Sequence, residues 1–144
     1  MGALVNPPPS SPAATKSMRG NRARDTKPEL QLRRLLRDAG YGGYRLHWPV
    51  PGRPDVAYPG RRVAIFVNGD FWHRCPHCNP PLPRANREFW QEKFARNVER
   101  DARKVRELEE LGWTVLTVWE CQLRDDPRRV LRELAPVLER SARG

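Results

Sequence analysis

Apolar residues in this chain gather in short runs, and turn-forming residues separate these runs. The continuous apolar run Val63–Val67 predicts a buried strand, which ends at the turn formers Asn68-Gly69-Asp70. A second run, Trp113–Trp119, predicts another buried strand. Residues 56–58 and 62–67 flank Pro59-Gly60, an arrangement typical of a hairpin, and Tyr44–Pro49 predicts one more short strand.

Apolar positions at helical spacing predict three helices. Thr26-Lys27-Pro28-Glu29 has the pattern of a capping box and opens a helix that runs to about Ala39. Asn86 is expected to cap a long helix over 87–111, which Gly112 ends. The buried stripe predicted for this long helix consists of Trp90, Phe94, Val98, Asp101, Val105 and Leu108.

A last amphipathic helix should begin at Asp126-Pro127, and Pro136 predicts a kink or a break near Ala135. The resulting order, helix–strand–strand–strand–helix–strand–helix, favours an α/β fold in which helices flank a mixed sheet. Residues 26–144 are expected to form one domain. The Pro- and Ser-rich stretch 1–16 predicts a disordered tail, and 17–25 predicts an arm that contacts DNA; the alternative is that this arm simply continues the tail.

The net charge is +10, from 27 Lys and Arg against 17 Asp and Glu. Arginine predominates, and its planar fork suits phosphate recognition, so a polyanion such as nucleic acid is the expected partner. A basic, solvated surface is the alternative. No apolar stretch approaches the roughly 20 residues that span a bilayer, and no secretory signal is recognised, so no membrane partner is expected.

Three cysteines, two of them in a C-x-x-C pair, indicate a reducing compartment and a metal site. Cys75 and Cys78 would supply two thiolates to a structural zinc, which needs four ligands. Cys121 is the most economical third ligand because it ends a core strand. The fourth is either Asp70 or His77, with Asp70 slightly favoured; three free thiols are the alternative.

Asp55 opens a strand that pairs with the strand leading to His73, so an acid and a histidine should lie close together. The Asp55 carboxylate and the carbonyl of Val67 could hold Mg²⁺. His73 suits a general base or acid because its ordinary pKa lies near neutrality. The alternatives are a turn-forming role for Asp55 and a packing role for His73.

Asp101 lies on the apolar face of the long helix, where an unpaired carboxylate is costly, so it should face a cation or a histidine. We expect it to orient His73, with a structural salt bridge as the alternative. The capping box accounts for Glu29 without catalysis. Phe71 and Trp72 follow a turn, and exposed aromatics on a basic protein can wedge between bases; core packing is the alternative, for Trp90 as well.

Five ordered blocks carry a resemblance to a known family. They are Pro51-Gly52-Arg53-Pro54-Asp55, Gly69-x-Phe71-Trp72-His73, Glu88-Phe89-Trp90, Asn97-Val98-Glu99-Arg100-Asp101 and Gly112-Trp113-x-Val115-Leu116-x-Val118-Trp119-Glu120-Cys121. Met18-Arg19 precedes them. Over about Ser17–Leu123 the chain resembles the very-short-patch-repair (Vsr) DNA mismatch endonucleases.

This resemblance implies a restriction-endonuclease-like core with a structural zinc knuckle. It implies a Mg²⁺-dependent enzyme that nicks one strand of double-stranded DNA at a T:G mismatch left by deamination of 5-methylcytosine. It also implies a monomer in the bacterial cytoplasm, associated with the nucleoid. Two alternatives are a nuclease of this fold with a different mismatch or modified-base target, and a non-catalytic zinc module that binds DNA.

The resemblance also implies roles for individual residues. Asp55 and the Val67 carbonyl match the Mg²⁺ site, and His73 matches the general base. Asp101 and Glu29 match supporting acids. The residues matching DNA contacts are Met18 and Arg19 in the arm and Phe71, Trp72 and Trp90 in the aromatic wedge.

Three positions depart from the pattern of the family. Asn68 stands where the family commonly has a histidine beside the catalytic residues; it can donate a hydrogen bond but cannot titrate. Asp70 replaces a zinc-binding cysteine, and Cys75 replaces a zinc-binding histidine. The predicted zinc ligands are therefore Asp70, Cys75, Cys78 and Cys121, with His77 in reserve.

Overall fold

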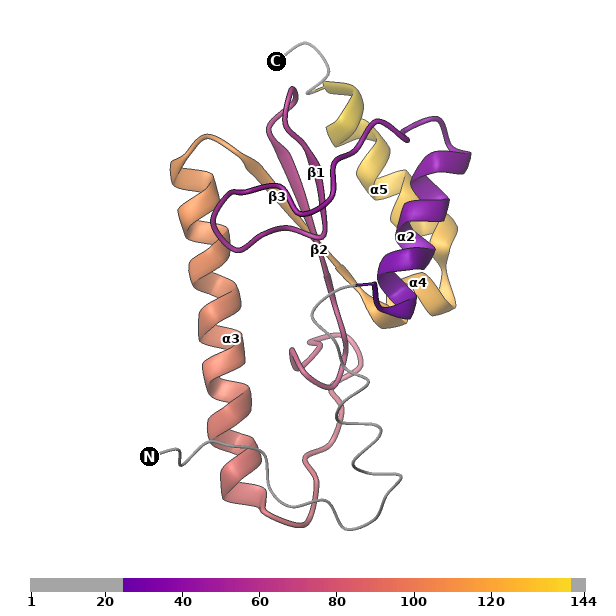
Figure 1. The fold of residues 1–144 in the computed structure, drawn as a ribbon. Helices are drawn as coiled ribbons and strands as arrows, with labels where there is room; N and C mark the ends of the chain where they lie inside the picture. Colours follow the sequence, from indigo (N-terminus) through magenta and orange to yellow (C-terminus); the bar gives the residue numbers. More distant parts are fainter. Residues whose placement is uncertain (1–24, 141–144) are drawn as a thin grey trace.

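The computed structural model describes residues 25–140. The predicted tail and nearly all of the predicted arm, including Met18 and Arg19, lie outside the described residues. Within them, three strands and four helices follow one another along the chain (Figure 1). They are α2 (Lys27–Asp38), β1 (Val56–Tyr58), β2 (Val63–Asn68), α3 (Arg87–Glu110), β3 (Thr114–Trp119), α4 (Glu120–Asp125) and α5 (Pro127–Arg140).

The strands form a mixed sheet in the order β1-β2-β3. β1 pairs antiparallel with β2, with Val56 opposite Ile65, and β3 pairs parallel with β2, with Val67 opposite Val118. A parallel pair needs a long crossover connection, and α3 supplies it. The expectation of a mixed sheet flanked by helices is confirmed.

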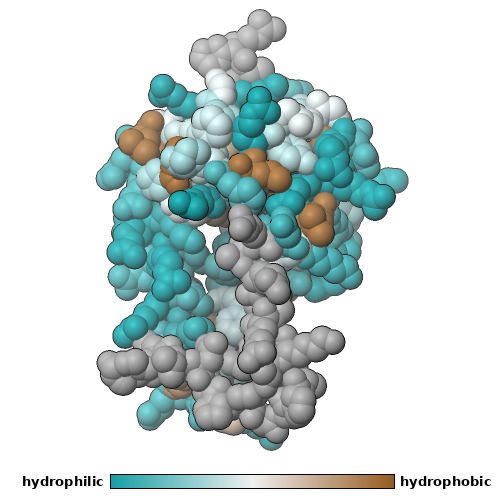
Figure 2. All heavy atoms as spheres, viewed as in Figure 1, coloured by the Kyte–Doolittle hydropathy of each residue, from teal (hydrophilic) through white to brown (hydrophobic). Residues whose placement is uncertain are grey.

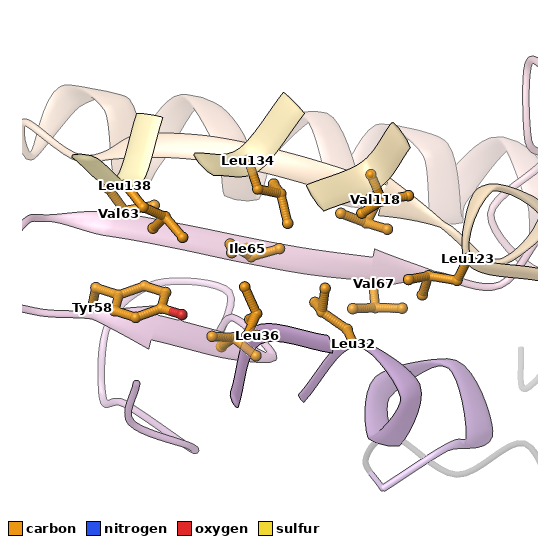
Figure 3. Packing of buried hydrophobic residues seen from close by; sticks show 12 residues of the cluster. Leu32, Leu36, Tyr58, Val63, Ile65, Val67, Val118, Leu123, Leu134 and Leu138 are labelled. Atoms are coloured by element: carbon orange, nitrogen blue, oxygen red, sulfur yellow. The ribbon is translucent and has the colours of Figure 1, made fainter. Parts of the chain in front are cut away.

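β2 is buried along its whole length because helices cover both faces of the sheet. Val63, Ile65 and Val67 point to one face, where side chains from α2, α4 and α5 meet them (Figure 3). Ala64 and Phe66 point to the other face, in a cluster with Leu108 of α3. Figure 1 shows the same layers, with α3 on one side of the sheet and α2, α4 and α5 on the other.

The predicted strand Tyr44–Pro49 is wrong. A single bridge between Arg45 and Ala57 takes its place. His47 has a φ of +56°, a left-handed conformation that turns the chain away from the extended path of a strand.

For two features, the sequence predicted more burial than the structure shows. β3 was predicted as a buried strand, yet Val118 is its one fully buried residue, because β3 has a neighbouring strand on one side only among the described residues. Val98 was placed on the buried stripe of α3, but it is 47% exposed.

The C-terminal part of the chain differs from the prediction in two ways. The strand is followed at once by α4, a short helix that the pattern of apolar residues did not reveal. The predicted break at Pro136 is wrong, since α5 is one helix from Pro127 to Arg140. Pro136 removes a hydrogen bond to the carbonyl of Arg132, and both residues are exposed, so water can satisfy that carbonyl.

Most side chains that Figure 2 shows outside the uncertain segments are hydrophilic. Among residues 25–140, no helix combines the length and the apolar character that crossing a membrane requires.

Candidate active site

The register of β1 and β2 places Asp55 at the end of the sheet where β2 terminates. Asp55 directly precedes β1, and Val56 lies opposite Ile65, so Asp55 reaches the last residues of β2. The backbone N–H of Val67 donates a hydrogen bond of 2.6 Å to Asp55 Oδ2. This bond uses one lone pair of Oδ2, so the carboxylate keeps lone pairs that could contact a cation.

The surroundings of Asp55 disfavour a bare negative charge. Burial raises the pKa of Asp55 from 3.8 to about 7, although the Val67 N–H bond opposes this shift. The negative charge of Glu29 raises the pKa further, while the charges of Lys104 and His73 lower it. A carboxylate in such a place is stabilised by a nearby cation, so its chemistry fits a divalent metal ligand.

The turn before Asp55 packs directly against α3. Gly52 has a φ of +79°, and a Cβ atom there would lie 2.8 Å from Cγ of Lys104. Glycine is thus required at position 52 by its backbone conformation and by its closeness to the helix. Pro54, which follows, is among the fully buried residues, so the turn presents Asp55 from a rigid base.

His73 and Asp101 form a pair, as their positions in the sequence predicted. His73 Nδ1 lies 2.5 Å from Asp101 Oδ2, and their side chains are 29% and 23% exposed. One turn earlier on α3, Asn97 Nδ2 donates a hydrogen bond of 3.0 Å to the carbonyl of Trp72. One face of α3 therefore holds the loop that follows β2, and this loop lies beside the N-terminal half of α3 (Figure 1).

Glu29 is buried at the start of α2. Its Oε1 accepts the N–H of Asp25 at 2.9 Å, and its Oε2 accepts the hydroxyl of Thr26 at 2.9 Å. Arg33 lies 3.5 Å from the same carboxylate. The helix begins after Thr26 as predicted, but the predicted capping box is wrong, because the Thr26 hydroxyl bonds Glu29 and makes no capping hydrogen bond to the helix backbone. The negative charge of Glu29 contributes to the raised pKa of Asp55.

Asn68, by contrast, is not tied to the pair of His73 and Asp101. It ends β2 opposite Trp119 and is 8% exposed. Among the described residues, its side chain makes no hydrogen bond to His73 or Asp101, whose own bond is direct.

Asp70, Cys75, Cys78 and Cys121 converge on one point. Their ligand atoms all lie within 4.8 Å of one another. Cys75 Sγ and Cys121 Sγ are 3.6 Å apart, and tetrahedral zinc with Zn–S bonds of about 2.3 Å would separate two sulfurs by about 3.7 Å. The donor set and its spacing therefore fit a structural zinc. His77, the reserve candidate, is not part of this group.

Hydrogen bonds connect the loop over residues 69–79, which we call the metal-site loop, to the start of α4. The N–H of Cys121 donates to Asp70 Oδ1, and the N–H of Asp70 donates to Glu120 Oε1, each at 3.2 Å. Burial raises the pKa of the Cys121 thiol, and the neighbouring Cys78 and Cys75 raise it further. A bound metal reverses this effect because its positive charge favours the thiolate.

Phe71, Trp72 and Trp90 pack on one another and on Phe94, forming a group that we call the aromatic cluster. The Phe71 ring centre lies 5.0 Å from those of Trp72 and Phe94, and Trp90 stacks on Phe94 at 5.4 Å. Trp90 is 8% exposed, whereas Phe71 and Trp72 are partly exposed. The cluster thus combines core packing with a surface that bases could contact.

Sequence reasoning missed two cations at this end of the molecule. The guanidinium of Arg74 lies 4.3 Å above the Phe94 ring and donates to the carbonyls of Phe71 and Pro80. Lys104 lies against Gly52. Lys104 follows Asp101 by three residues, so both lie on one face of α3. This spacing is the sequence signal that could have identified Lys104.

Comparison with known proteins identifies several relatives. The family model described as DNA mismatch endonuclease Vsr matches residues 11–79. The DNA mismatch endonuclease Vsr of Escherichia coli (strain K12) is 45% identical over 111 residues, which cover 76% of this chain and 70% of that protein. The type II nicking enzyme V.XorIIP of Xanthomonas oryzae pv. oryzae is 41% identical over 105 residues, covering 72% and 76% of the two chains.

A solved structure is similar as well. The catalytic domain of the homing endonuclease I-Bth0305I superposes with a TM-score of 0.56 at 25% sequence identity. The match covers 81% of this chain and 98% of that domain.

Proposed function

The chain belongs to the Vsr family of DNA mismatch endonucleases, and from this premise we propose that it nicks one strand of double-stranded DNA beside a T:G mismatch. The mismatch would arise by deamination of 5-methylcytosine, and the reaction would depend on Mg²⁺. We further propose a restriction-endonuclease-like core and a monomer that acts on DNA in the bacterial cytoplasm.

One juxtaposition carries this proposal: Asp55, the end of β2 and the His73–Asp101 pair occupy the same end of the sheet, next to the aromatic cluster. Asp55 and the carbonyl of Val67 would hold Mg²⁺. When bound, the ion would neutralise charge on the phosphate and lower the pKa of a water ligand. The raised pKa of Asp55 in the metal-free protein supports this assignment, since burial, its largest cause, disfavours a negative charge that a bound cation would stabilise.

His73 is the group suited to accept a proton from the attacking water. Asp101 contacts Nδ1, so the Nδ1–H tautomer is favoured and Nε2 keeps its lone pair for the proton. When Nε2 takes up that proton, the ring becomes positive and the Asp101 carboxylate stabilises it at 2.5 Å. In this mechanism, Asp101 both orients the base and balances its charge.

The metal-site loop would keep His73 and the aromatic cluster in place for the reaction. Cys75 lies two residues after His73, and the zinc ligands would join this part of the loop to Cys121 in the first turn of α4. The partly exposed faces of Phe71 and Trp72 would contact the unstacked bases at the mismatch. Wedging of aromatics between bases would thus select a weak point in the duplex.

A panel of duplexes tests the proposed function. We expect the protein with Mg²⁺ to nick one strand of a T:G duplex, and to leave the matched T:A duplex and all samples with EDTA intact. Nicking of a different mismatch or of a methylated duplex would instead support a nuclease of the same fold with another target. Binding without nicking on every duplex would support the non-catalytic zinc module.

His73→Ala is expected to lower the single-turnover rate of nicking by roughly 10²- to 10⁴-fold, the usual contribution of a general base. DNA affinity should be retained because His73 is assigned to proton transfer. Rapid-quench kinetics and a fluorescence binding assay measure the two effects separately. His77→Ala, the same change on the same loop, serves as the control and should leave both unchanged. If affinity falls as far as the rate, His73 is a binding residue.

A further inference from the structure

Lys104 is a cation beside the active site that the proposed chemistry does not use. It lies on α3 three residues after Asp101, so the two side chains share a face of the helix. Its Cβ, Cγ and Cδ atoms cover the backbone of Gly52, in the turn that leads to Asp55. Its Nζ lies 5.9 Å from the centre of the Phe66 ring in β2. The stem is therefore held between the turn and the sheet.

Each of the two carboxylates near Lys104 has a partner of its own. Asp101 contacts His73, and Asp55 accepts the N–H of Val67. Among residues 25–140, six ion pairs occur and none includes Lys104. A partly buried ammonium without a carboxylate partner is stabilised if an anion approaches it. Without such an anion, the ammonium is attracted more weakly, by the face of the Phe66 ring.

The same face of α3 positions three segments of the site. Asn97 holds the carbonyl of Trp72, Asp101 holds His73, and Lys104 packs on Gly52. A rigid helix thus sets the distance between the general base and the turn that carries Asp55. The ammonium of Lys104 is near enough to Asp55 to lower the pKa of that carboxyl, so a phosphate held beside Asp55 would lie near it as well.

We propose that Lys104 binds an anionic phosphodiester of the DNA strand that is cut, as a further substrate-binding residue of the active site. The inference rests on the proposed function and adds a residue to it. Lysine suits this task because its ammonium acts as a point charge on a phosphate. The competing role is structural, in which the stem merely covers Gly52 and Phe66.

Lys104→Met tests the proposal because methionine keeps an unbranched apolar stem and removes the charge. Arg106→Met is the matched control, since it removes one positive charge from an exposed position on the other side of α3. The first measurement is the salt dependence of binding to a T:G duplex in EDTA, where nicking does not occur. Losing one phosphate contact should reduce the slope of log K against log[salt] by about 1.

The second measurement is the single-turnover rate of nicking with Mg²⁺. We expect the rate of Lys104→Met to be roughly 10- to 100-fold lower than that of Arg106→Met, because a charge that contacts the reacting phosphate also stabilises its transition state. Lys104→Arg should restore the salt slope and most of the rate. The Tm of both Lys104 variants should stay within about 3 °C of the parent protein.

Two results would overturn the inference. The first is a Lys104→Met protein whose salt slope and rate equal those of Arg106→Met. The second is a loss of activity that Lys104→Arg does not restore and that accompanies a fall in Tm, which would assign a structural role. If the parent protein does not nick the T:G duplex, the proposed function fails. The salt slopes still decide whether Lys104 contacts phosphate, since they require binding alone.

Discussion

Asp55→Asn is expected to lower the rate of nicking by at least roughly 10³-fold, because an amide oxygen carries no charge to hold Mg²⁺. The fold should be kept, since the asparagine oxygen can still accept the N–H of Val67 that now bonds Asp55 Oδ2 at 2.6 Å. Gel-resolved cleavage of the T:G duplex over a long time course measures the loss. Near-normal nicking by this variant, or by Asp55→Ala, would refute the role assigned to Asp55.

The same substitution should stabilise the metal-free protein above pH 7. Burial, the largest cause, raises the pKa of Asp55 from 3.8 to about 7, so the folded state holds this proton at pH values where the unfolded state has released it. Because the unfolded state then binds fewer protons, stability falls as the pH rises between about 4 and 7. The full difference between the two pKa values corresponds to roughly 4 kcal/mol in the free energy of unfolding. We expect Asp55→Asn to raise the free energy of unfolding by about 2–4 kcal/mol at pH 8.

Urea unfolding in EDTA at pH 4 and pH 8 measures this effect. The advantage of Asp55→Asn should be present at pH 8 and mostly lost at pH 4, where the carboxyl is protonated in the folded state and partly protonated in the unfolded state. Asp38→Asn, an exposed change at the end of α2, is the control and should alter stability by about 0.5 kcal/mol or less at either pH. Equal stability of Asp55→Asn and the parent protein at pH 8 would contradict the assigned cause.

Cys121→Ser is expected to release one zinc ion per chain and to destabilise the protein by several kcal/mol. Cys121 would connect the first turn of α4 to the loop ligands Asp70, Cys75 and Cys78. The free energy of metal binding contributes directly to folding in such a site. Elemental analysis of the purified protein measures the zinc, and thermal unfolding should show a Tm lower by roughly 10 °C or more. A chelator should reproduce both effects in the parent protein.

The fourth ligand is tested with two further variants. Asp70→Ala should weaken zinc retention during dialysis against a chelator, whereas His77→Ala should retain zinc as the parent protein does. His77 lies in the same loop but outside the group of converging ligand atoms, so it is the matched control. Loss of zinc from His77→Ala with retention in Asp70→Ala would reverse the assignment. A parent protein without zinc would mean that the cysteines are free thiols.

Much of the fold was predictable from local patterns. The stripe of α2, its start after Thr26 and the buried run of β2 are properties of short segments, so local sequence patterns identified them. The failures depend on interactions between segments. The segment 44–49 could not be excluded as a strand because its geometry is decided by the left-handed His47. The continuity of α5 at Pro136 depended on which face of that helix meets solvent.

The candidate site shows the same division. His73 and Asp101 were expected to pair because each had a reason to need the other, and they lie 2.5 Å apart. The sequence favoured Asp70 only slightly over His77, since Asp70 precedes the C-x-x-C pair at the strand end and His77 lies inside it. The structure brings Asp70 to the cysteines through its bond to the N–H of Cys121.

The sequence by itself determined which residues can do chemistry and roughly where they occur: the acids, the histidine, the thiols and the aromatics are types whose properties do not depend on the fold. Only the tertiary structure decided which of them meet. The crossing of α3 over the turn at Gly52 places Lys104 beside Asp55, and no local periodicity encodes that crossing. The physical reason is that such contacts follow from the packing of several elements around β2, which is a property of the whole chain.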